Sequence, residues 1–192
     1  FHCGEEELRD FWAPYFDLEG DYGAYKKRID PADAYLVRAA DFGRGIRILK
    51  QDLWEMIVTF IISQQNNIRR IRRIVQLLSE TYGKKCVSGE GKVYDSFPGP
   101  GELARATEED LRACNLGYRS RYIRKTVEMV LGGEVDLKAL EGMDYPAARA
   151  ELMRLSGVGG KVADCICLFA LHHLEAFPVD THIKKVLDEQ YP

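Results

Sequence analysis

One short stretch decides the fold of this chain of 192 residues: residues 155–164 read LSGVGGKVAD. Apolar residues on both sides of three glycines predict a helix, a tight turn at residues 156–160 and a second helix. Glycine permits a positive φ and lets backbone amides approach a ligand, and a helix start presents unpaired N–H groups. We therefore expect Gly157 and Gly159 to bind a phosphate group. A plain turn between two helices that needs glycine remains the alternative.

Lys161 follows this hairpin directly and falls in the first turn of the second predicted helix. The helix dipole disfavours a cation there by roughly 0.3–1 kcal/mol, and we expect burial among apolar neighbours to act in the same direction. Both effects favour the neutral amine, so Lys161 is the candidate nucleophile. A surface lysine that binds phosphate is the alternative. Cys165 lies one turn later on the same helix face, where it either contacts the amine or is a small buried residue.

A second short motif follows at residues 178–182, PVDTH. Asp180 is expected to cap the last helix. A capping carboxylate can also stabilise positive charge that develops on a sugar during glycosyl transfer, so Asp180 is the candidate partner of the lysine. His182 falls in the first turn of that helix, where it either donates to a phosphate or is a surface histidine.

Outward from these motifs, helical signals dominate the chain. The periodicity and caps predict helices at residues 8–16, 31 onward with Asp30 as its cap, 52–62, 68–82, 107 onward, 120–131, 144–155, 162–171 and 180 onward. The segment 89–100 is rich in glycine and proline and predicts a loop, and no convincing alternating strand pattern is present. We expect an all-α fold of two helical lobes with a cleft between them.

Composition narrows the classes of protein. The net charge of −3 argues against indiscriminate binding to nucleic acid, yet residues 66–125 carry thirteen Lys/Arg against seven acidic residues. The five cysteines include no CxxC pair for zinc and no quartet for an iron–sulfur cluster, so a reducing compartment is the simpler interpretation. No apolar run approaches 18 residues, and the start has neither a signal peptide nor an initiator Met. We expect no membrane association and a piece of a longer protein.

Several stretches resemble one family. Residues 155–171, LSGVGGKVADCICLFAL, with 177–183, FPVDTHI, resemble the helix-hairpin-helix, Gly/Pro, Asp superfamily of DNA glycosylases, and the KVADCIC run resembles its 8-oxoguanine DNA glycosylases. Three further stretches resemble family segments. Residues 62–71, ISQQNNIRRI, are similar to its gap-filling loop and helix, residues 116–122, LGYRSRY, to its intercalating wedge, and residues 97–98 to its short FP turn. The resemblance is strong over residues 50–192 and weak before.

The resemblance implies an enzyme of DNA repair that flips an oxidised purine out of duplex DNA and removes it. Lys161 would attack C1′ of the sugar, form a Schiff base and nick the strand by β-elimination, while Asp180 stabilises the developing charge. Cys165 would belong to the base pocket. His182 would contact a phosphate.

It also implies roles in holding the DNA. Gln65, where animal members usually have Asn, would fill the space of the flipped base, with Asn66 beside it. Tyr118 would wedge next to the orphaned cytosine, and Arg70 and Arg119 would donate hydrogen bonds to that cytosine. Without the hairpin, a solvated basic helix end would be the preferred interpretation of these residues.

No cofactor is required by this resemblance, but members often hold a monovalent cation or calcium on hairpin carbonyls, here those of Met153, Leu155 and Val158. The partner would be double-stranded DNA with an oxidised purine opposite cytosine. A monomer is expected, in the nucleoid of a bacterial cell or in a eukaryotic nucleus. Residues 1–192 would form the helical catalytic region, with the hairpin beside a DNA-binding cleft. We expect the family's N-terminal β-rich lobe and its C-terminal helix, which closes the base pocket, to be absent from this chain.

Three other functions stay open from the residues alone. A related glycosylase for alkylated or other oxidised bases would share the hairpin; enzymes for alkylated bases usually lack a lysine at position 161, and those for oxidised pyrimidines usually carry an iron–sulfur cluster. A non-catalytic DNA-binding module would use the hairpin only for phosphates. A helical protein-interaction domain would require the hairpin, Lys161 and Asp180 to be coincidental.

Overall fold

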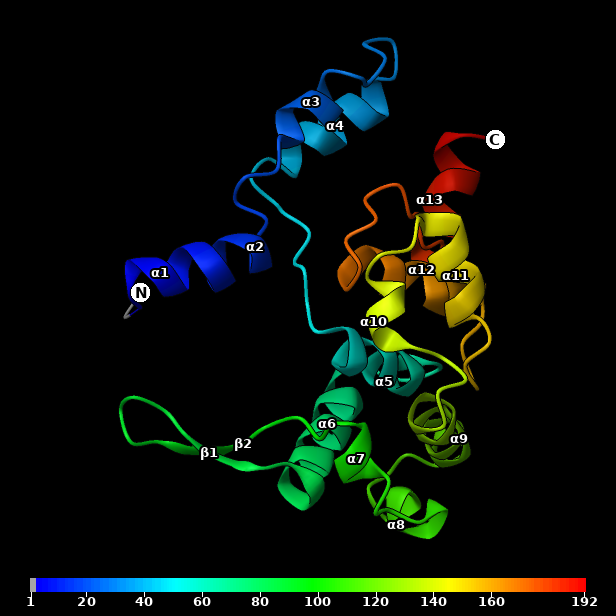
Figure 1. The fold of residues 1–192 in the computed structure, drawn as a ribbon. Coiled ribbons are helices and arrows are strands. Elements are labelled where there is room, and N and C mark those ends of the chain that lie inside the picture. The colour runs from blue at the N-terminus through cyan, green and yellow to red at the C-terminus, as the bar shows by residue number, and fades with distance from the viewer. Residues whose placement is uncertain (1–2) are drawn as a thin grey trace. The chain divides into compact units, whose positions relative to one another are not determined.

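The computed structural model describes residues 3–192, so the first two residues of the predicted region 1–192 lie outside the described residues. The chain divides into two compact units, a smaller one of Phe1–Gln51 with Val179–Pro192 and a larger one of Asp52–Pro178. Both are helical (Figure 1), which confirms the predicted all-α class. Among residues 3–192, no helix is long and apolar enough to cross a membrane.

The larger unit is built around two apolar helices. Its helices are α5 (Leu53–Ser63), α6 (Ile68–Tyr82), α7 (Pro100–Leu103), α8 (Glu108–Ala113), α9 (Arg119–Leu131), α10 (Leu137–Leu140), α11 (Tyr145–Leu152) and α12 (Gly160–Phe169). Helices α5 and α12 pack against each other, and Ile57 and Ile61 of α5 and Ile166 of α12 are fully buried in the core. Helix α12, which follows the hairpin, is therefore part of the core of this unit.

Side-chain caps set many of the helix boundaries. The Asp52 carboxylate accepts the N–H of Glu55 at 2.7 Å to begin α5, and Thr107 and Asp110 form a capping box at the start of α8. The indole of Trp54 donates to the carbonyl oxygen of Pro98 at 2.9 Å, which ties α5 to the turn before α7. These local signals explain why α5, α6, α8, α9, α11 and α12 lie within two or three residues of predicted helices, whereas the short helices α7 and α10 were not predicted.

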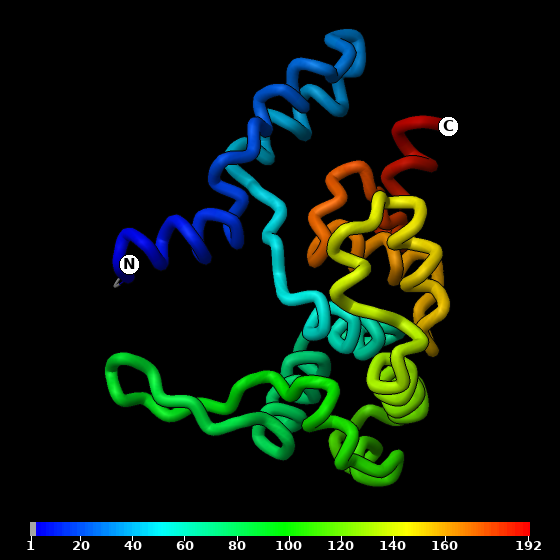
Figure 2. The backbone as a smooth tube through the Cα atoms, in the orientation of Figure 1, coloured from blue at the N-terminus to red at the C-terminus, as the bar shows by residue number. Residues whose placement is uncertain are grey.

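A short β-hairpin replaces part of the loop predicted at residues 89–100. Strand β1 (Lys85–Val87) pairs antiparallel with β2 (Val93–Asp95), with Lys85 opposite Asp95. Figure 2 shows this hairpin projecting from the helices of the larger unit. Each strand has three residues, too few to display a two-residue alternation, so the sequence pattern could not reveal it. The Lys85 ammonium lies 2.7 Å from the Asp95 carboxylate, and this cross-strand ion pair supports the register.

The smaller unit contains the remaining helices. They are α1 (Glu5–Glu7), the π-helical turn η1 (Leu8–Trp12), α2 (Ala13–Tyr15), α3 (Tyr22–Lys26), α4 (Ala34–Phe42) and α13 (Thr181–Gln190). The prediction that Asp30 caps a helix is wrong. Asp33 caps α4 by accepting the N–H of Leu36 at 2.8 Å, whereas Asp30 accepts the N–H of Ala32 in a local turn. The Tyr191 hydroxyl donates to the Asp33 carboxylate at 2.7 Å and joins the end of α13 to α4.

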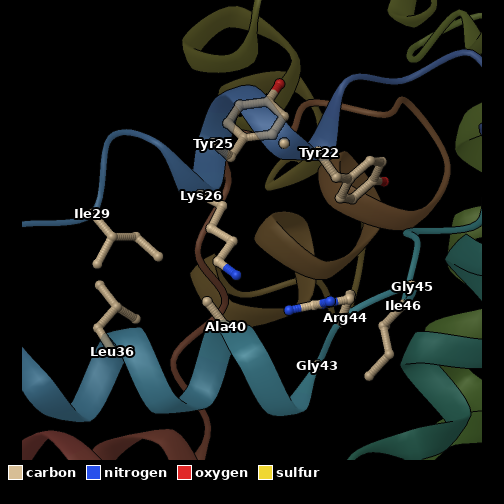
Figure 3. A pocket seen from close by; sticks show the side chains of 11 residues that line it. Tyr22, Tyr25, Lys26, Ile29, Leu36, Ala40, Gly43, Arg44, Gly45 and Ile46 are labelled. Atoms are coloured by element: carbon tan, nitrogen blue, oxygen red, sulfur yellow. The ribbon is translucent and has the colours of Figure 1, made fainter. Parts of the chain in front are cut away.

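A cavity of about 400 Å³ lies between α3 and α4 in this unit. Figure 3 shows Ile29 and Leu36 facing each other on one side of it, and the cationic ends of Lys26 and Arg44 on another. The Lys26 ammonium is paired with the carboxylate of Asp41. The cavity is therefore mainly apolar, with its charges at the rim.

Candidate active site

The predicted hairpin is present between α11 and α12, and Gly157 is its conformational requirement. Gly157 has a φ of 82°, in the left-handed region that favours glycine. A Cβ atom at this residue would lie 2.7 Å from Cγ of the Tyr122 ring. Both the backbone angle and the packing against Tyr122 therefore require glycine here.

Gly159 has no such structural reason to be glycine. Its φ of −94° and ψ of 176° are open to any residue, and a Cβ atom there would meet nothing within 4 Å. It is the N-cap of α12 and supplies no side-chain acceptor to the first amides of that helix. Exposed amides at a helix start, beside a residue without a side chain, suit close approach of a phosphate.

The hairpin carbonyls are held by the rest of the larger unit. The hydroxyl of Thr126 donates to the carbonyl of Ser156 at 3.1 Å, and the Gln64 side-chain amide donates to the carbonyl of Gly157 at 2.8 Å. Within the hairpin, the N–H of Val158 donates to the carbonyl of Leu155 at 3.1 Å. These bonds turn the carbonyls toward the protein and fix the peptide planes that precede α12.

Lys161 is the second residue of α12, so its predicted place in the first turn is confirmed. Its predicted burial is wrong. The side chain is exposed, because it stands on the open side of a helix whose buried residues include Val162 and Ile166. The Nζ atom lies 6.0 Å from the centre of the Phe60 ring, which stacks on Phe169 at 5.9 Å. The amine is accessible to a substrate from outside.

Cys165 lies one turn after Lys161 and is only 4% exposed. The buried environment fits the simpler interpretation of a small core residue, and its part in a base pocket stays a prediction. Two residues further on, burial raises the pKa of the Cys167 thiol to about 12.

Asp180 and His182 belong to the smaller unit. The predicted cap is confirmed: the Asp180 carboxylate accepts the N–H groups of His182 at 2.9 Å and Ile183 at 2.8 Å at the start of α13. His182 is exposed in the first turn of that helix, as expected. Asp180 and Lys161 lie in different units, so their meeting across a cleft stays a prediction.

The loop at residues 63–67, which joins α5 to α6, holds one residue in an unusual conformation. Gln65 has a φ of 46° and an exposed side chain, although it is not glycine. Its neighbour Asn66 donates from its side chain to the carbonyl of Ile62 at 3.0 Å, and Asn67 caps α6. Gln65 therefore projects from a loop whose following residues are tied to the protein.

Arg119 holds this loop, a role that the sequence did not indicate. It is 2% exposed, and its Nε donates to the carbonyl of Gln64 at 3.0 Å and its Nη2 to the carbonyl of Gln65 at 3.1 Å. Its guanidinium also stacks on the ring of Tyr118, 4.5 Å from the ring centre. Arg119 is thus engaged with backbone carbonyls. Its predicted contact with an orphaned cytosine stays a prediction.

Tyr118 and Arg70 complete this cluster. Tyr118 is 42% exposed and its hydroxyl lies 3.5 Å from the carbonyl oxygen of Gln64. Arg70 is exposed on α6 and donates to the carbonyl of Asn115 at 3.3 Å. The structure therefore brings the predicted gap-filling and wedge residues together, although about fifty residues separate them along the chain.

A second group of residues, which the sequence did not indicate, connects the two helices of the hairpin, α11 and α12. The Asp164 carboxylate of α12 accepts hydrogen bonds from Arg149 at 2.6 Å and from the hydroxyl of Tyr145 at 2.8 Å, both on α11. Burial and this hydrogen bond raise the pKa of Tyr145, and the Asp164 carboxylate raises the pKa of Arg149. The only sequence signal was an acidic residue on an otherwise apolar helix.

The expected cation site depends on backbone carbonyls of Met153, Leu155 and Val158. The carbonyl of Leu155 accepts one hydrogen bond, from Val158, and a carbonyl oxygen has a second lone pair for a cation. In the part of the chain that the structure describes, no three His, Cys, Asp or Glu side chains gather as a metal site would require. Cation binding by these carbonyls stays a prediction.

Comparison with known proteins agrees with this geometry. Residues 58–191 match the HhH-GPD superfamily of base excision DNA repair proteins, and residues 1–57 match the N-terminal domain of 8-oxoguanine DNA glycosylase. The N-glycosylase/DNA lyase of Saccharomyces cerevisiae is 38% identical over 98% of this chain and 53% of its own length. The N-glycosylase/DNA lyase OGG1 of Arabidopsis thaliana is 36% identical over 96% of this chain and 52% of its own length.

A solved structure is also similar. The 8-oxoguanine glycosylase/lyase of Clostridium acetobutylicum, in complex with double-stranded DNA containing cytosine opposite 8-oxoguanine, superposes with a TM-score of 0.92 at 40% identity. This covers all of the present chain and 66% of that chain. The present chain spans about half the length of the two curated relatives above. These matches confirm the resemblance and extend it over residues 1–57, where it was expected to be weak. The chain belongs to the HhH-GPD superfamily of base excision DNA repair proteins.

Proposed function

We propose that this chain is the helical part of a bifunctional DNA glycosylase and lyase that removes 8-oxoguanine from duplex DNA. One observation carries the proposal: an exposed lysine amine stands in the first turn of α12, directly after a glycine hairpin that leaves the start of that helix without a side-chain cap. The names of the relatives, N-glycosylase/DNA lyase and 8-oxoguanine glycosylase/lyase, support it.

In this reaction the neutral amine of Lys161 attacks C1′ of the extruded nucleotide. A C1′–Nζ bond forms, the bond from C1′ to the base nitrogen breaks, and its electron pair leaves with the base, which takes up a proton. Opening of the sugar ring then converts the attached amine to a Schiff base. Loss of a proton from C2′ expels the 3′ phosphate by β-elimination and nicks the strand, and hydrolysis frees the enzyme. The Asp180 carboxylate would stabilise positive charge at the sugar during base departure.

The duplex would be held by groups that do not touch the reacting atoms. The amides after Gly159 would bind one phosphate and His182 another, both without reading the sequence. A base inside the duplex is beyond the reach of the lysine, so the nucleotide must be flipped out at a cost of a few kcal/mol. Gln65 would fill the space left behind, with Asn66 beside it, and Tyr118 would wedge next to the partner base.

Recognition of that partner base as cytosine is part of the proposal. The exposed Arg70 suits its acceptor atoms directly, and Arg119 would contribute once its carbonyl partners release it. A cation on the hairpin carbonyls would add positive charge near a phosphate. We propose a monomer that acts where the cell keeps its DNA.

Borohydride trapping on two duplexes tests the proposal. One duplex carries 8-oxoguanine opposite cytosine. The other carries an abasic site, whose aldehyde tests the lysine chemistry without base recognition. The matched variants are Lys161→Gln and Lys138→Gln, because Lys138 is also an exposed second residue of a helix in the same unit. We expect adducts with wild type and Lys138→Gln and none with Lys161→Gln.

Each of the other outcomes would contradict a different part of the proposed function. Adducts with Lys161→Gln at the wild-type level would remove that residue as nucleophile. Duplex binding without any adduct would leave a non-catalytic DNA-binding module. Release of an alkylated base in preference to 8-oxoguanine, measured in parallel, would change the substrate.

A further inference from the structure

Gln64 bonds to two functional segments at once, and neither the reaction above nor the resemblance assigns it a role. Its side-chain Nε2 donates to the carbonyl of Gly157 in the hairpin at 2.8 Å, and lies 3.4 Å from the carbonyl of Ile61. Its own carbonyl accepts hydrogen bonds from Arg119. The side chain is half-buried, directly before the strained residue Gln65.

We propose that Gln64 is a positioning residue that couples the 63–67 loop to the hairpin. This inference rests on the proposed function and concerns how its two DNA-contacting segments act together. The loop would fill the space of the flipped base, and the hairpin would hold a phosphate and aim Lys161. A hydrogen bond across ninety-three residues of chain joins them.

The hydrogen bond from Gln64 fixes the peptide unit between Gly157 and Val158. The carbonyl of Gly157 and the N–H of Val158 belong to one planar peptide unit, so they turn together. Glycine alone offers little resistance to such a turn. Gln64 holds the carbonyl, and the carbonyl of Leu155 holds the N–H at 3.1 Å, which fixes the plane from both sides. The same plane leads into Gly159 and the first turn of α12.

The coupling is reciprocal. When DNA draws Gln65 into the duplex, the adjoining Gln64 moves with it, and its amide carries the displacement to the hairpin carbonyl. Equally, a phosphate that orders the hairpin also orders the loop. Loss of one neutral hydrogen bond changes an equilibrium roughly two- to tenfold, and we expect an effect of this size on attack by Lys161.

Two substitutions separate this role from simple packing. Gln64→Glu keeps the shape but presents an ionised carboxylate to the carbonyl of Gly157, so it cannot donate at neutral pH. Protonation restores a donor to the carbonyl of Gly157. Gln64→Met has similar volume and no donor at any pH. Gln190→Glu, exposed at the end of α13, controls for the change of charge.

The experiment measures the single-turnover rate of borohydride trapping on the abasic duplex from pH 5 to pH 8.5, as a ratio to wild type. For Gln64→Glu we expect a roughly three- to tenfold loss at pH 8 that recovers toward pH 5, and for Gln64→Met a loss at every pH. For Gln190→Glu we expect a ratio near one. Ratios near one for both Gln64 variants, or equal losses for both at all pH values, would overturn the inference.

A second measurement stands apart from the chemistry. Hydrogen exchange at the amides of residues 157–161 should be roughly two- to tenfold faster in Gln64→Met than in wild type, without DNA. Unchanged exchange would overturn the coupling even if trapping succeeds. If wild type forms no adduct but the exchange differs as expected, the proposed function fails and the coupling of loop and hairpin stands.

Discussion

Alanine substitutions of the two hairpin glycines should affect different properties. Gly157→Ala should lower stability, whereas Gly159→Ala should weaken DNA binding and leave stability almost unchanged. Gly157→Ala places a Cβ atom 2.7 Å from the Tyr122 ring on a backbone with a φ of 82°. The left-handed conformation costs a non-glycine residue about 1–2 kcal/mol, and the overpacking about 1–3 kcal/mol. We expect the free energy of unfolding to fall by roughly 2–5 kcal/mol, which lowers Tm by roughly 4–20 °C in a chain of this size.

Gly159→Ala is the matched control. A Cβ atom there meets nothing within 4 Å, and the backbone is extended. Loss of a glycine N-cap costs up to about 1 kcal/mol, so the variant should melt close to wild type. Its methyl group would instead stand where a phosphate approaches, and loss of a hydrogen bond to a charged group weakens binding about tenfold or more.

Thermal unfolding followed by circular dichroism, and fluorescence anisotropy with an undamaged duplex, measure the two effects. A free energy of unfolding for Gly157→Ala within about 1 kcal/mol of the wild-type value would contradict the close packing of this residue on Tyr122. Equal loss of stability in the two variants would refute it as well, because only Gly157 packs on Tyr122. Unchanged duplex affinity in Gly159→Ala would remove the phosphate site from the start of α12.

Two further predictions concern buried groups of the larger unit. Arg119→Ala leaves the carbonyls of Gln64 and Gln65 without their donor, so we expect a loss of about 2–4 kcal/mol in urea unfolding and faster exchange in the 63–67 loop; a loss under about 0.5 kcal/mol would contradict the clamp. Cys167 is fully buried with a pKa raised from 9.0 to about 12, so its contribution to stability is present below pH 9 and is lost as the pH rises toward 12. Native Cys167 should therefore resist iodoacetamide at pH 9 and react after unfolding in urea, whereas modification at equal rates in both states would show that the thiol is accessible.

Local chemistry explains which parts of the fold were predictable. Asp144 caps α11, Asp180 caps α13 and Gly83 follows the end of α6 because caps act within one turn of the chain. The wrong prediction for the cap of α4 also follows from local chemistry. Asp30 and Asp33 both carry a capping carboxylate, and Pro31 made the first seem the helix start, while the structure uses the second.

Tertiary contacts explain what the sequence could not reveal. Arg119 looks like a surface arginine in a basic segment, and only the fold brings the carbonyls of Gln64 and Gln65 to it. The exposure of Lys161 depends on which face of α12 turns to the core, and an almost wholly apolar helix does not indicate that face. The sequence therefore indicated which residues belong to the candidate site, but not which residues they contact.

The proposed reaction requires that the Nζ atom of Lys161 bonds to C1′ of the sugar. Mass spectrometry of the borohydride-reduced adduct, after proteolysis, locates the attached sugar on one residue. We predict the modification on Lys161, with Lys138 and Lys125 unmodified. A sugar attached to any other lysine or to the terminal amine, in a protein that still binds the duplex, would show that Lys161 is not the nucleophile.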